Sequence, residues 1–308
     1  MDKWSRLSDK IQQIRGSVEG TIGVAVTDLS TGEELQLDGD ELFPLASVLK
    51  IPVLVEMYRQ VGRGELDLDT RYTLTEDIKS HGSGVLKEIR PGAALTLWDY
   101  ALLMIIISDN TATDTVCSIV GIDKVDPTMR ALGLERTSVR VDCFHLLCEL
   151  TGLDTNQPRE KVLEESMKRF RSVSEEDLIA QIRRGDLGKN VSTPVEMNKL
   201  LAKLLEPGGA RAMNGEVLLG PQEQAGAIDI LQRQQLRQRI PYLLPRGTVV
   251  AHKTGTVPGT FNDCGIVYGP DQKPAYIISL LSKGVTDLLE GPMILAKISK
   301  AVYDELIG

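Results

Sequence analysis

Strand-like runs of apolar and β-branched residues are confined to the two ends of the chain. Near the start, residues 22–29 and 33–38 are two such runs joined by a Ser-Thr-Gly turn, which predicts a β-hairpin. Three further runs lie near the end, separated by Pro-Gly and Gly-Pro-Asp turns: residues 248–256, 262–268 and 275–282. We therefore expect five antiparallel strands contributed by both ends of the chain.

Between these two groups, from Pro44 to about Glu206, the pattern is almost entirely helical. Thr96 and Asp99 have the spacing of a capping box before a helix that reaches Ile107. That helix is apolar nearly all round, so we expect it to be buried.

This order of elements predicts an α+β fold of the α/β-sandwich type, in which an antiparallel five-stranded sheet is flanked by helices. Residues 1–45 and 221–308 would form a discontinuous sheet subdomain, and residues 46–220 an inserted all-helical subdomain. Residues 154–189 are richer in charge than their surroundings and predict one or two amphipathic surface helices.

Composition narrows the possible partners. With 308 residues, of which 42 % are apolar, the chain can bury a sizeable core. The formal net charge of -8 repels phosphate backbones, so nucleic acid is not expected as a partner. No apolar run approaches the roughly 20 residues that span a bilayer, so no membrane segment is expected. The partner we expect is a small-molecule substrate, and the sequence gives no indication of the oligomeric state.

The start of the chain, from Met1 to Arg6, lacks the basic patch and apolar core of an export signal. As written the protein would be cytoplasmic, and it would be exported if a leader has been removed. The four cysteines and three histidines are scattered, so no metal and no cofactor are expected. Cys143 and Cys148 flank His145, but the neighbouring Phe and Leu residues favour a buried apolar segment over a ligand cluster.

Ser47 and Lys50 have the spacing of a nucleophile and its base. The apolar segment before Ser47 leads into a run that we expect to be a helix starting at the serine. The exposed amides at a helix N-terminus favour negative charge developing on that hydroxyl. Lys50 lies one turn away on the same face, and an apolar surround would favour a neutral amine able to accept the serine proton.

Ser108, Asp109 and Asn110 lie in the break between the buried helix that ends at Ile107 and a helix capped at Thr111. These residue types are also common in ordinary connections, so this motif alone leaves a purely structural role open. In the functional hypothesis, the Ser108 hydroxyl passes a proton to the leaving group and the Asn110 amide donates to the substrate carbonyl.

A third motif lies on an expected strand and consists of Lys253, Thr254, Gly255 and Thr256. Glycine would allow close approach of this strand to the serine, and the backbone amides of Ser47 and Thr256 would form an oxyanion hole. Lys253 and Thr254 would hold a substrate carboxylate. His252 lies on the same strand, where we expect a structural role.

The three motifs in this order resemble the signature of class A β-lactamases and penicillin-binding proteins. Other segments are similar to the class A family as well: residues 22–38, 43–47, 82–86, 97–110, 192–197 and 265–267. The resemblance covers most of the chain and implies a cleft between the sheet and the helical subdomain. It also implies acyl transfer to Ser47, with Lys50 and Ser108 in catalysis.

One expected piece of the family pattern is missing. Class A β-lactamases carry a glutamate, in a Glu-x-x-Leu-Asn loop, that activates the water for deacylation, and no such motif occurs here. The nearest match, Glu149-Leu150-Thr151, is poor. We expect the charged stretch 160–184 to replace or extend that loop over the cleft. Glu160, Glu164 and Glu165 are alternative bases, and the sequence does not select one.

Three functions therefore stay open. The leading hypothesis is a β-lactamase-like serine hydrolase that acts on a β-lactam or a related amide or ester. The alternatives are a D-alanyl-D-alanine peptidase or esterase with the same nucleophile, and a penicillin-binding sensor domain that is acylated without turnover.

Overall fold

The computed structural model describes residues 2–154, 159–172, 176–177, 179–180 and 187–308. Its main sheet is antiparallel, with the strand order β2-β1-β11-β10-β9. The five strands are β1 (Thr21–Asp28), β2 (Glu34–Leu37), β9 (Val250–Val257), β10 (Thr260–Tyr268) and β11 (Pro274–Lys283). The expected α+β fold with a five-stranded antiparallel sheet is thus confirmed. Pairing of β1 with β11 joins the two ends of the chain in one sheet.

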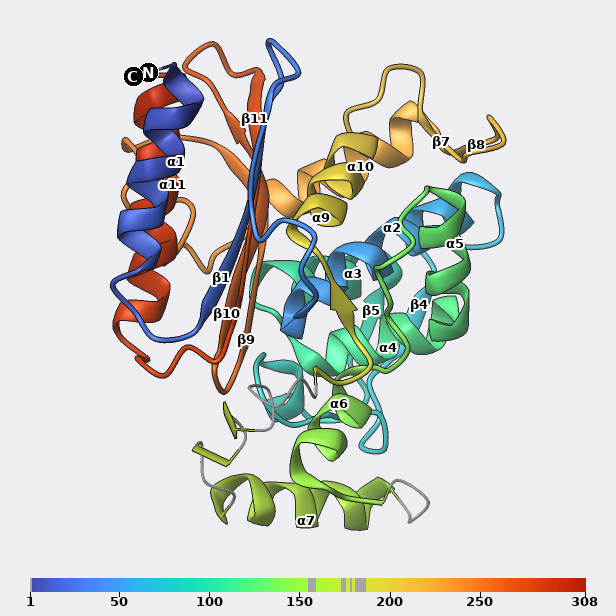
Figure 1. The fold of residues 1–308 in the computed structure, drawn as a ribbon. Helices are drawn as coiled ribbons and strands as arrows, with labels where there is room; N and C mark the ends of the chain where they lie inside the picture. The colour runs from blue at the N-terminus through green and yellow to red at the C-terminus, as the bar shows by residue number, and fades with distance from the viewer. Residues whose placement is uncertain (1, 155–158, 173–175, 178, 181–186) are drawn as a thin grey trace.

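Helices α1 (Lys3–Arg15) and α11 (Glu290–Leu306) cover one face of the sheet, side by side (Figure 1). α1 is amphipathic and turns Leu7 and Ile11 inward, where they join a core formed with α11 and the sheet. Burial of these two side chains fixes the first helix to the last part of the chain.

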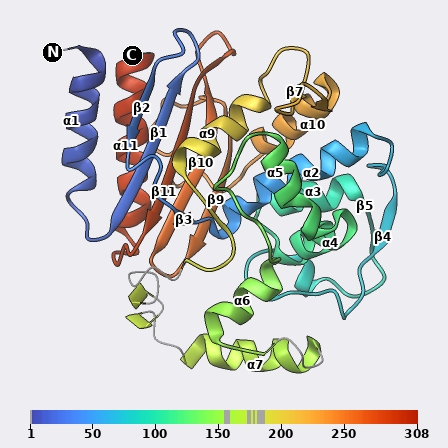
Figure 2. The same cartoon turned by 45° about the vertical axis from the view of Figure 1, so that its right-hand side comes forward.

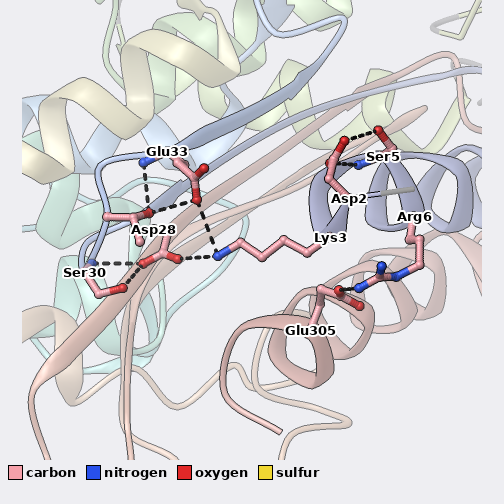
Figure 3. A network of polar contacts seen from close by, with 9 residues as sticks. Asp2, Lys3, Ser5, Arg6, Asp28, Ser30, Glu33 and Glu305 are labelled. Carbon is pink, nitrogen blue, oxygen red and sulfur yellow. Dashed lines mark hydrogen bonds and ion pairs between the residues drawn. The ribbon is translucent and has the colours of Figure 1, made fainter.

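Polar contacts at the end of α1 reinforce this packing (Figure 3). Lys3 Nζ lies 3.2 Å from a carboxylate oxygen of Asp28 in β1, and Arg6 lies 2.8 Å from Glu305 in α11. Burial opposes ionisation of Asp28, but hydrogen bonds from Ser30 and Lys3 outweigh it and lower the pKa of Asp28.

The other face of the sheet packs against α9 (Pro194–Lys203), and strand β9 packs against α10 (Pro221–Gln232) and η1 (Ala46–Leu49) (Figures 1 and 2). A large apolar core lies between this face and the helices. The other elements described here are β3 (Phe43–Pro44), α2 (Lys50–Gly62), β4 (Arg71–Thr73), η2 (Leu86–Glu88), β5 (Ala94–Thr96), α3 (Leu97–Ile106), α4 (Asn110–Val120), η3 (Ile122–Lys124), α5 (Val125–Ala131), α6 (Cys143–Thr151), α7 (Arg159–Ser172), β6 (Val191–Ser192), β7 (Ala210–Arg211) and β8 (Val217–Leu219). Among the residues described, none of these helices is both long and apolar enough to cross a membrane.

The capping box before α3 is confirmed: Thr96 and Asp99 exchange side-chain and backbone hydrogen bonds. The expected cap of the following helix is wrong by two residues. Asp109 caps α4 by accepting a hydrogen bond from the Ala112 amide at 2.9 Å. Thr111 cannot take this role, because it already lies inside the helix and its hydroxyl accepts from the Ser80 amide.

The helix expected to start at Ser47 is also different. Ser47 lies in the short 3₁₀ helix η1, and α2 begins only at Lys50. Pro52 therefore falls in the first turn of α2, where its missing N–H would have no intrahelical partner in any case. In a helix that started at Ser47, Pro52 would remove one backbone hydrogen bond. Because α2 starts at Lys50, no such bond is lost.

Helices α6 and α7 form an appendage that extends beyond the rest of the molecule in both views (Figures 1 and 2). They pack on each other through a small cluster that contains Phe144, Cys148 and Val162. Part of the charged segment 154–189 lies outside the described residues. Cys143 and Cys148 are buried free thiols, as the apolar interpretation of this segment expected.

Candidate active site

A cavity of about 270 Å³ brings the three sequence motifs together. Residues from η1, the α3–α4 break and β9 meet there although they are far apart in the chain. Its polar lining consists of Ser47, Ser83, Ser108, Asn110, Thr254 and Thr256. Hydroxyl and amide side chains from separate parts of the chain therefore meet in one cavity.

The backbone around Ser47 is strained and closely packed. Ala46, immediately before it, has a left-handed φ of 46°. Across the gap, a Cβ added to Gly255 would lie 3.1 Å from the Ser47 nitrogen and 2.7 Å from the Leu45 carbonyl oxygen. Only glycine fits this position without displacing backbone, so Gly255 lets β9 approach the serine amide. Strain of this kind is concentrated at functional sites in many proteins.

Lys50 is fully buried, and its amine is held by three oxygens. It donates to the Ser108 carbonyl oxygen at 2.9 Å, to the Ser108 hydroxyl at 2.9 Å and to Asn110 Oδ1 at 3.1 Å. The environment of the Lys50 amine is therefore more polar than the apolar environment that was expected from the sequence. These contacts fix the amine at the floor of the cavity between η1 and the α3–α4 break.

Ser108 is the bridge between two lysines. Its hydroxyl accepts from Lys50 at 2.9 Å and from Lys253 at 3.1 Å. Its own φ of 59° is left-handed, which is unfavourable for a residue with a Cβ. The Ser108 carbonyl oxygen also accepts a hydrogen bond from Ser83 Oγ at 2.7 Å. These hydrogen bonds stabilise a left-handed backbone conformation at Ser108 that is unfavourable for serine on its own.

Lys253 is fully buried on β9. Burial lowers the pKa of Lys253 well below its usual value, and the nearby Lys50 amine lowers it further, while the Asp263 carboxylate opposes the shift. The Lys253 amine also donates to the Thr254 carbonyl oxygen at 2.8 Å. A buried amine with a depressed pKa that is hydrogen-bonded to a serine hydroxyl is suited to exchanging a proton with that hydroxyl.

Comparison with known proteins agrees with this geometry. A family model described as the β-lactamase enzyme family matches residues 6–306. The chain belongs to this family. It is a β-lactamase-like serine hydrolase, as the sequence motifs predicted.

Curated relatives include Beta-lactamase VEB-1 of Pseudomonas aeruginosa, which is 23 % identical over 97 % of this chain and 89 % of its own length. Among solved structures, a β-lactamase from Sphaerobacter thermophilus is 25 % identical, with a TM-score of 0.76 over 98 % of this chain and 97 % of that one. PBP-A is also 25 % identical, with a TM-score of 0.74 over 97 % and 95 %.

The Asn110 amide is oriented by the loop at residues 80–86. It donates to the His81 carbonyl oxygen at 2.9 Å, and its Oδ1 accepts from Ser83 Oγ at 3.3 Å as well as from Lys50. A Cβ on Gly82 would lie 2.5 Å from Asn110 Nδ2, so glycine is needed beside this amide. The loop therefore lies beside the candidate site. Its residues 82–86 were among the segments that resemble the class A family, but no role had been predicted for Ser83.

Arg239 is a second residue that the motifs missed. It is buried beneath β9, where it donates to the Gly255 carbonyl oxygen at 2.7 Å and to the Thr256 hydroxyl. Burial lowers the pKa of Arg239 to about 10, against the opposing effect of Asp263, so the guanidinium stays charged at neutral pH. No local motif marks this arginine, since its position depends on a long connection folding back under the sheet.

His252 takes the structural role that was expected for it. It is fully buried, and its Nδ1 lies 2.9 Å from Asp263 Oδ1 on the neighbouring strand. Asp263 also accepts from the Ile240 amide at 3.0 Å.

No acidic side chain is among the described residues that line the cavity of this β-lactamase relative. Glu149 lies 2.6 Å from Lys189 instead. On α7, Glu164 and Glu165 each lie 2.7 Å from a basic residue one turn on; Glu164 is exposed and Glu165 is partly buried. The side chain of Glu160 lies outside what the structure describes. The wall from α6 is formed by Cys143, Leu146, Leu147 and Leu150.

Proposed function

We propose that Ser47 is the nucleophile that takes up the acyl group of a β-lactam or a related amide or ester. One observation carries this proposal. The Ser108 hydroxyl lies 2.9 Å from the Lys50 amine and 3.1 Å from the Lys253 amine, in the cavity that Ser47 lines. A hydroxyl held between two buried amines and beside a second hydroxyl is suited to relaying a proton during acyl transfer.

In the first step, Ser47 Oγ attacks the carbonyl carbon, and the Oγ–C bond forms as the hydroxyl proton passes to a base in the site, for which the Lys50 amine is our candidate. The carbonyl oxygen gains negative charge, which the amides of Ser47 and Thr256 would stabilise. As the C–N or C–O bond breaks, Ser108 protonates the leaving group and regains a proton from a lysine. The closeness of Gly255 to the Ser47 amide supports this placement of the oxyanion hole.

The substrate carboxylate would bind on the β9 side of the cavity. Lys253 and Thr254 remain our candidates for this role, with Thr256 exposed beside them. Arg239, bonded to the Thr256 hydroxyl, adds a buried positive charge behind this position. Two basic side chains and two threonine hydroxyls at this position favour an anionic group at that end of the substrate.

The relatives point to the same chemistry. The curated relatives named above are β-lactamases, and one solved PBP-A mutant is an acyl-enzyme complex with penicillin G, at 25 % identity and a TM-score of 0.73. No observation favours a D-alanyl-D-alanine peptidase or a sensor domain over a β-lactamase-like hydrolase. The second step is the attack of water on the acyl-enzyme, which needs a base. No aspartate or glutamate is among the described residues that line the cavity.

The test is incubation with benzylpenicillin followed by intact-mass measurement over time. We expect a covalent adduct on the wild-type protein, and the decay of this adduct reports the rate of deacylation. Ser47→Ala should keep the thermal unfolding profile and lose the adduct completely, because the variant lacks only the attacking oxygen. An adduct that persists in Ser47→Ala would show that another residue is acylated.

A further inference from the structure

Three buried basic side chains lie directly behind the polar lining of the cavity. Lys50 and Lys253 are fully buried and both donate to the Ser108 hydroxyl. Arg239 is 7 % exposed and donates to the Thr256 hydroxyl. Within the described part of the chain, every hydrogen bond of these three side chains goes to an uncharged oxygen. Buried positive charges are costly unless a negative charge lies nearby, so the source of that charge decides how the cluster behaves.

A buried carboxylate on the neighbouring strand supplies such a charge. Asp263 lies on β10 opposite Thr254 of β9, and its side chain is fully buried. Burial and the charges of Lys50 and Arg239 lower the pKa of Lys253, whereas the Asp263 carboxylate raises it. Asp263 also opposes the lowering of the pKa of Arg239 by burial. The same carboxylate therefore acts on both basic groups beside β9.

The Asp263 carboxylate is also bonded to the chain neighbours of both basic residues. One oxygen lies 2.9 Å from Nδ1 of His252, which directly precedes Lys253 on β9. The other oxygen accepts from the amide of Ile240, directly after Arg239, at 3.0 Å. A single side chain on β10 thus fixes the backbone beside Lys253 and beside Arg239, and it supplies the charge that opposes theirs.

His252 leaves the negative charge of Asp263 uncompensated. Its Nε2 atom is buried and has no hydrogen-bond partner among the residues that the structure describes. A protonated imidazole donates from both nitrogens, so it would bury a charged N–H without an acceptor. The neutral form, with Nδ1–H donating to Asp263, avoids this cost. The Cys143 thiol also faces Lys253, but burial raises the pKa of Cys143 to about 12, so it is uncharged at neutral pH.

We propose that Asp263 is a positioning residue for recognition of the anionic end of the acyl donor, because it holds Lys253 and Arg239 in place and sustains the positive charge of Lys253. This inference rests on the proposed acylation of Ser47. Asp263 is not among the residues that line the cavity, so it acts through its neighbours and not on the substrate. Even with Lys50 neutral as the base, one carboxylate against two cations leaves a net positive charge for a substrate carboxylate.

Benzylpenicillin and its methyl ester separate the anionic end from the rest of the substrate, since they share the lactam and the side group and only the acid is charged. The second-order rate constant of Ser47 acylation is measured for each by intact mass, from about pH 6 to about pH 9. The ratio of acid to ester reports recognition of the carboxylate, because groups that act equally on both substrates cancel. We expect a wild-type ratio of at least about 10 at neutral pH.

Asp263→Asn removes the charge and keeps the size of the side chain. The ratio at neutral pH should fall by about 10-fold, mainly because benzylpenicillin reacts more slowly, and the rate with the methyl ester should stay within about 3-fold. Without the carboxylate the pKa of Lys253 lies lower, so its positive charge is lost at a lower pH. The pH at which the ratio declines should therefore move down in the variant. A purely structural role would slow both substrates and leave that pH unchanged.

His252→Asn is the matched control at the same buried position. The asparagine amide can replace Nδ1 as the donor to Asp263, so the carboxylate keeps its charge. The ratio and its pH dependence should match those of the wild type, even where thermal unfolding occurs at a lower temperature. Asp263→Ser is a second uncharged variant, which retains one hydroxyl for hydrogen bonding and repeats the test in a smaller side chain.

The outcomes separate this role from the proposed function. Equal wild-type rates with acid and ester, or a ratio and pH dependence that Asp263→Asn leaves unchanged, overturn the role of Asp263 and leave acylation of Ser47 intact. Failure of both uncharged variants to fold, while His252→Asn folds, assigns Asp263 to stability alone and also overturns the role. Absence of an adduct with both substrates overturns the proposed function and this inference with it.

Discussion

Ser108 combines two properties that oppose each other within one residue. Its left-handed φ of 59° disfavours any side chain, yet its hydroxyl receives hydrogen bonds from both site lysines. A sequence with only local preferences would place glycine here. The strained conformation is retained because it aims the hydroxyl between Lys50 and Lys253, which indicates that the hydroxyl has a role beyond stability.

This conflict predicts different results for two substitutions of Ser108. Both Ser108→Gly and Ser108→Ala remove the hydroxyl, so both should slow acylation by about 10²-fold or more. Only glycine relieves the backbone strain, so the glycine variant should be more stable than the alanine variant by about 1 kcal/mol. Urea unfolding of the two variants measures this difference. Equal stability would mean that the left-handed conformation is not strained in the folded protein.

At the scale of elements, Asp109 links the loop before η2 to the start of α4. Its carboxylate accepts from the amides of Val85, Leu86 and Ala112 at 2.6, 2.8 and 2.9 Å. The same buried carboxylate thus caps a helix and closes the loop that carries Ser83. Neighbouring motif residues therefore have separate tasks, since Ser108 and Asn110 face the cavity while Asp109 holds their supporting elements together.

Asp109→Asn should show both consequences. The amide group retains one acceptor oxygen, so at least one buried backbone N–H loses its partner, at a cost of about 1–3 kcal/mol. Acylation should also slow, because the loop that orients Asn110 loosens. Asp99→Asn is a matched control, since Asp99 caps α3 away from the cavity. It should lose some stability and keep the wild-type rate. Unfolding in urea and labelling by benzylpenicillin are the two measurements.

The elements were predictable wherever the signal is local. The strand that carries Lys253 and the strands of the N-terminal hairpin begin and end within two or three residues of the predicted positions, because turn residues and β-branched runs mark them. The 3₁₀ turn at Ser47 could not be predicted from the sequence, because a 3₁₀ turn and the first turn of an α-helix share the same apolar spacing. The apolar residues of α6 have the spacing of a core helix, and only the packing of α6 shows that Cys143, Leu146, Leu147 and Leu150 line the cavity.

At the scale of the whole molecule, the site depends on contacts between segments that are 145 to 217 residues apart in the chain. The Lys253–Ser108 bond joins β9 to the α3–α4 break, and Asn262 donates to the Leu45 carbonyl oxygen beside η1. The ordered motifs let the sequence predict that these segments meet. Arg239 lies in no such motif, because its position depends on the three-dimensional course of the chain. The segment 82–86 resembled the family, but its contact with Asn110 was not predicted from sequence.

The same tight packing predicts that the protein loses stability at alkaline pH. Cys264 lies on the inner strand β10, and its burial raises the pKa of the thiol to about 12, from an ordinary value near 9. Between these two pH values the unfolded chain releases the thiol proton and the folded chain keeps it. Stability from this thiol is therefore complete below about pH 9 and is lost as the pH rises toward 12.

Cys264→Ala isolates this effect, because the other buried thiols and Tyr58 are present in both proteins. At pH 8 the variant should be less stable than the wild type by about 1 kcal/mol, through lost packing. At pH 10.5 the wild type should have lost about 2 kcal/mol that the variant keeps, since each unit of pH beyond the unfolded pKa is worth about 1.4 kcal/mol. The order of stability should therefore reverse between these pH values in urea unfolding. A difference between the two proteins that stays constant from pH 8 to 10.5 would show that the thiol ionises as easily in the folded sheet as in water, and would contradict the closed packing of β10 against its neighbours.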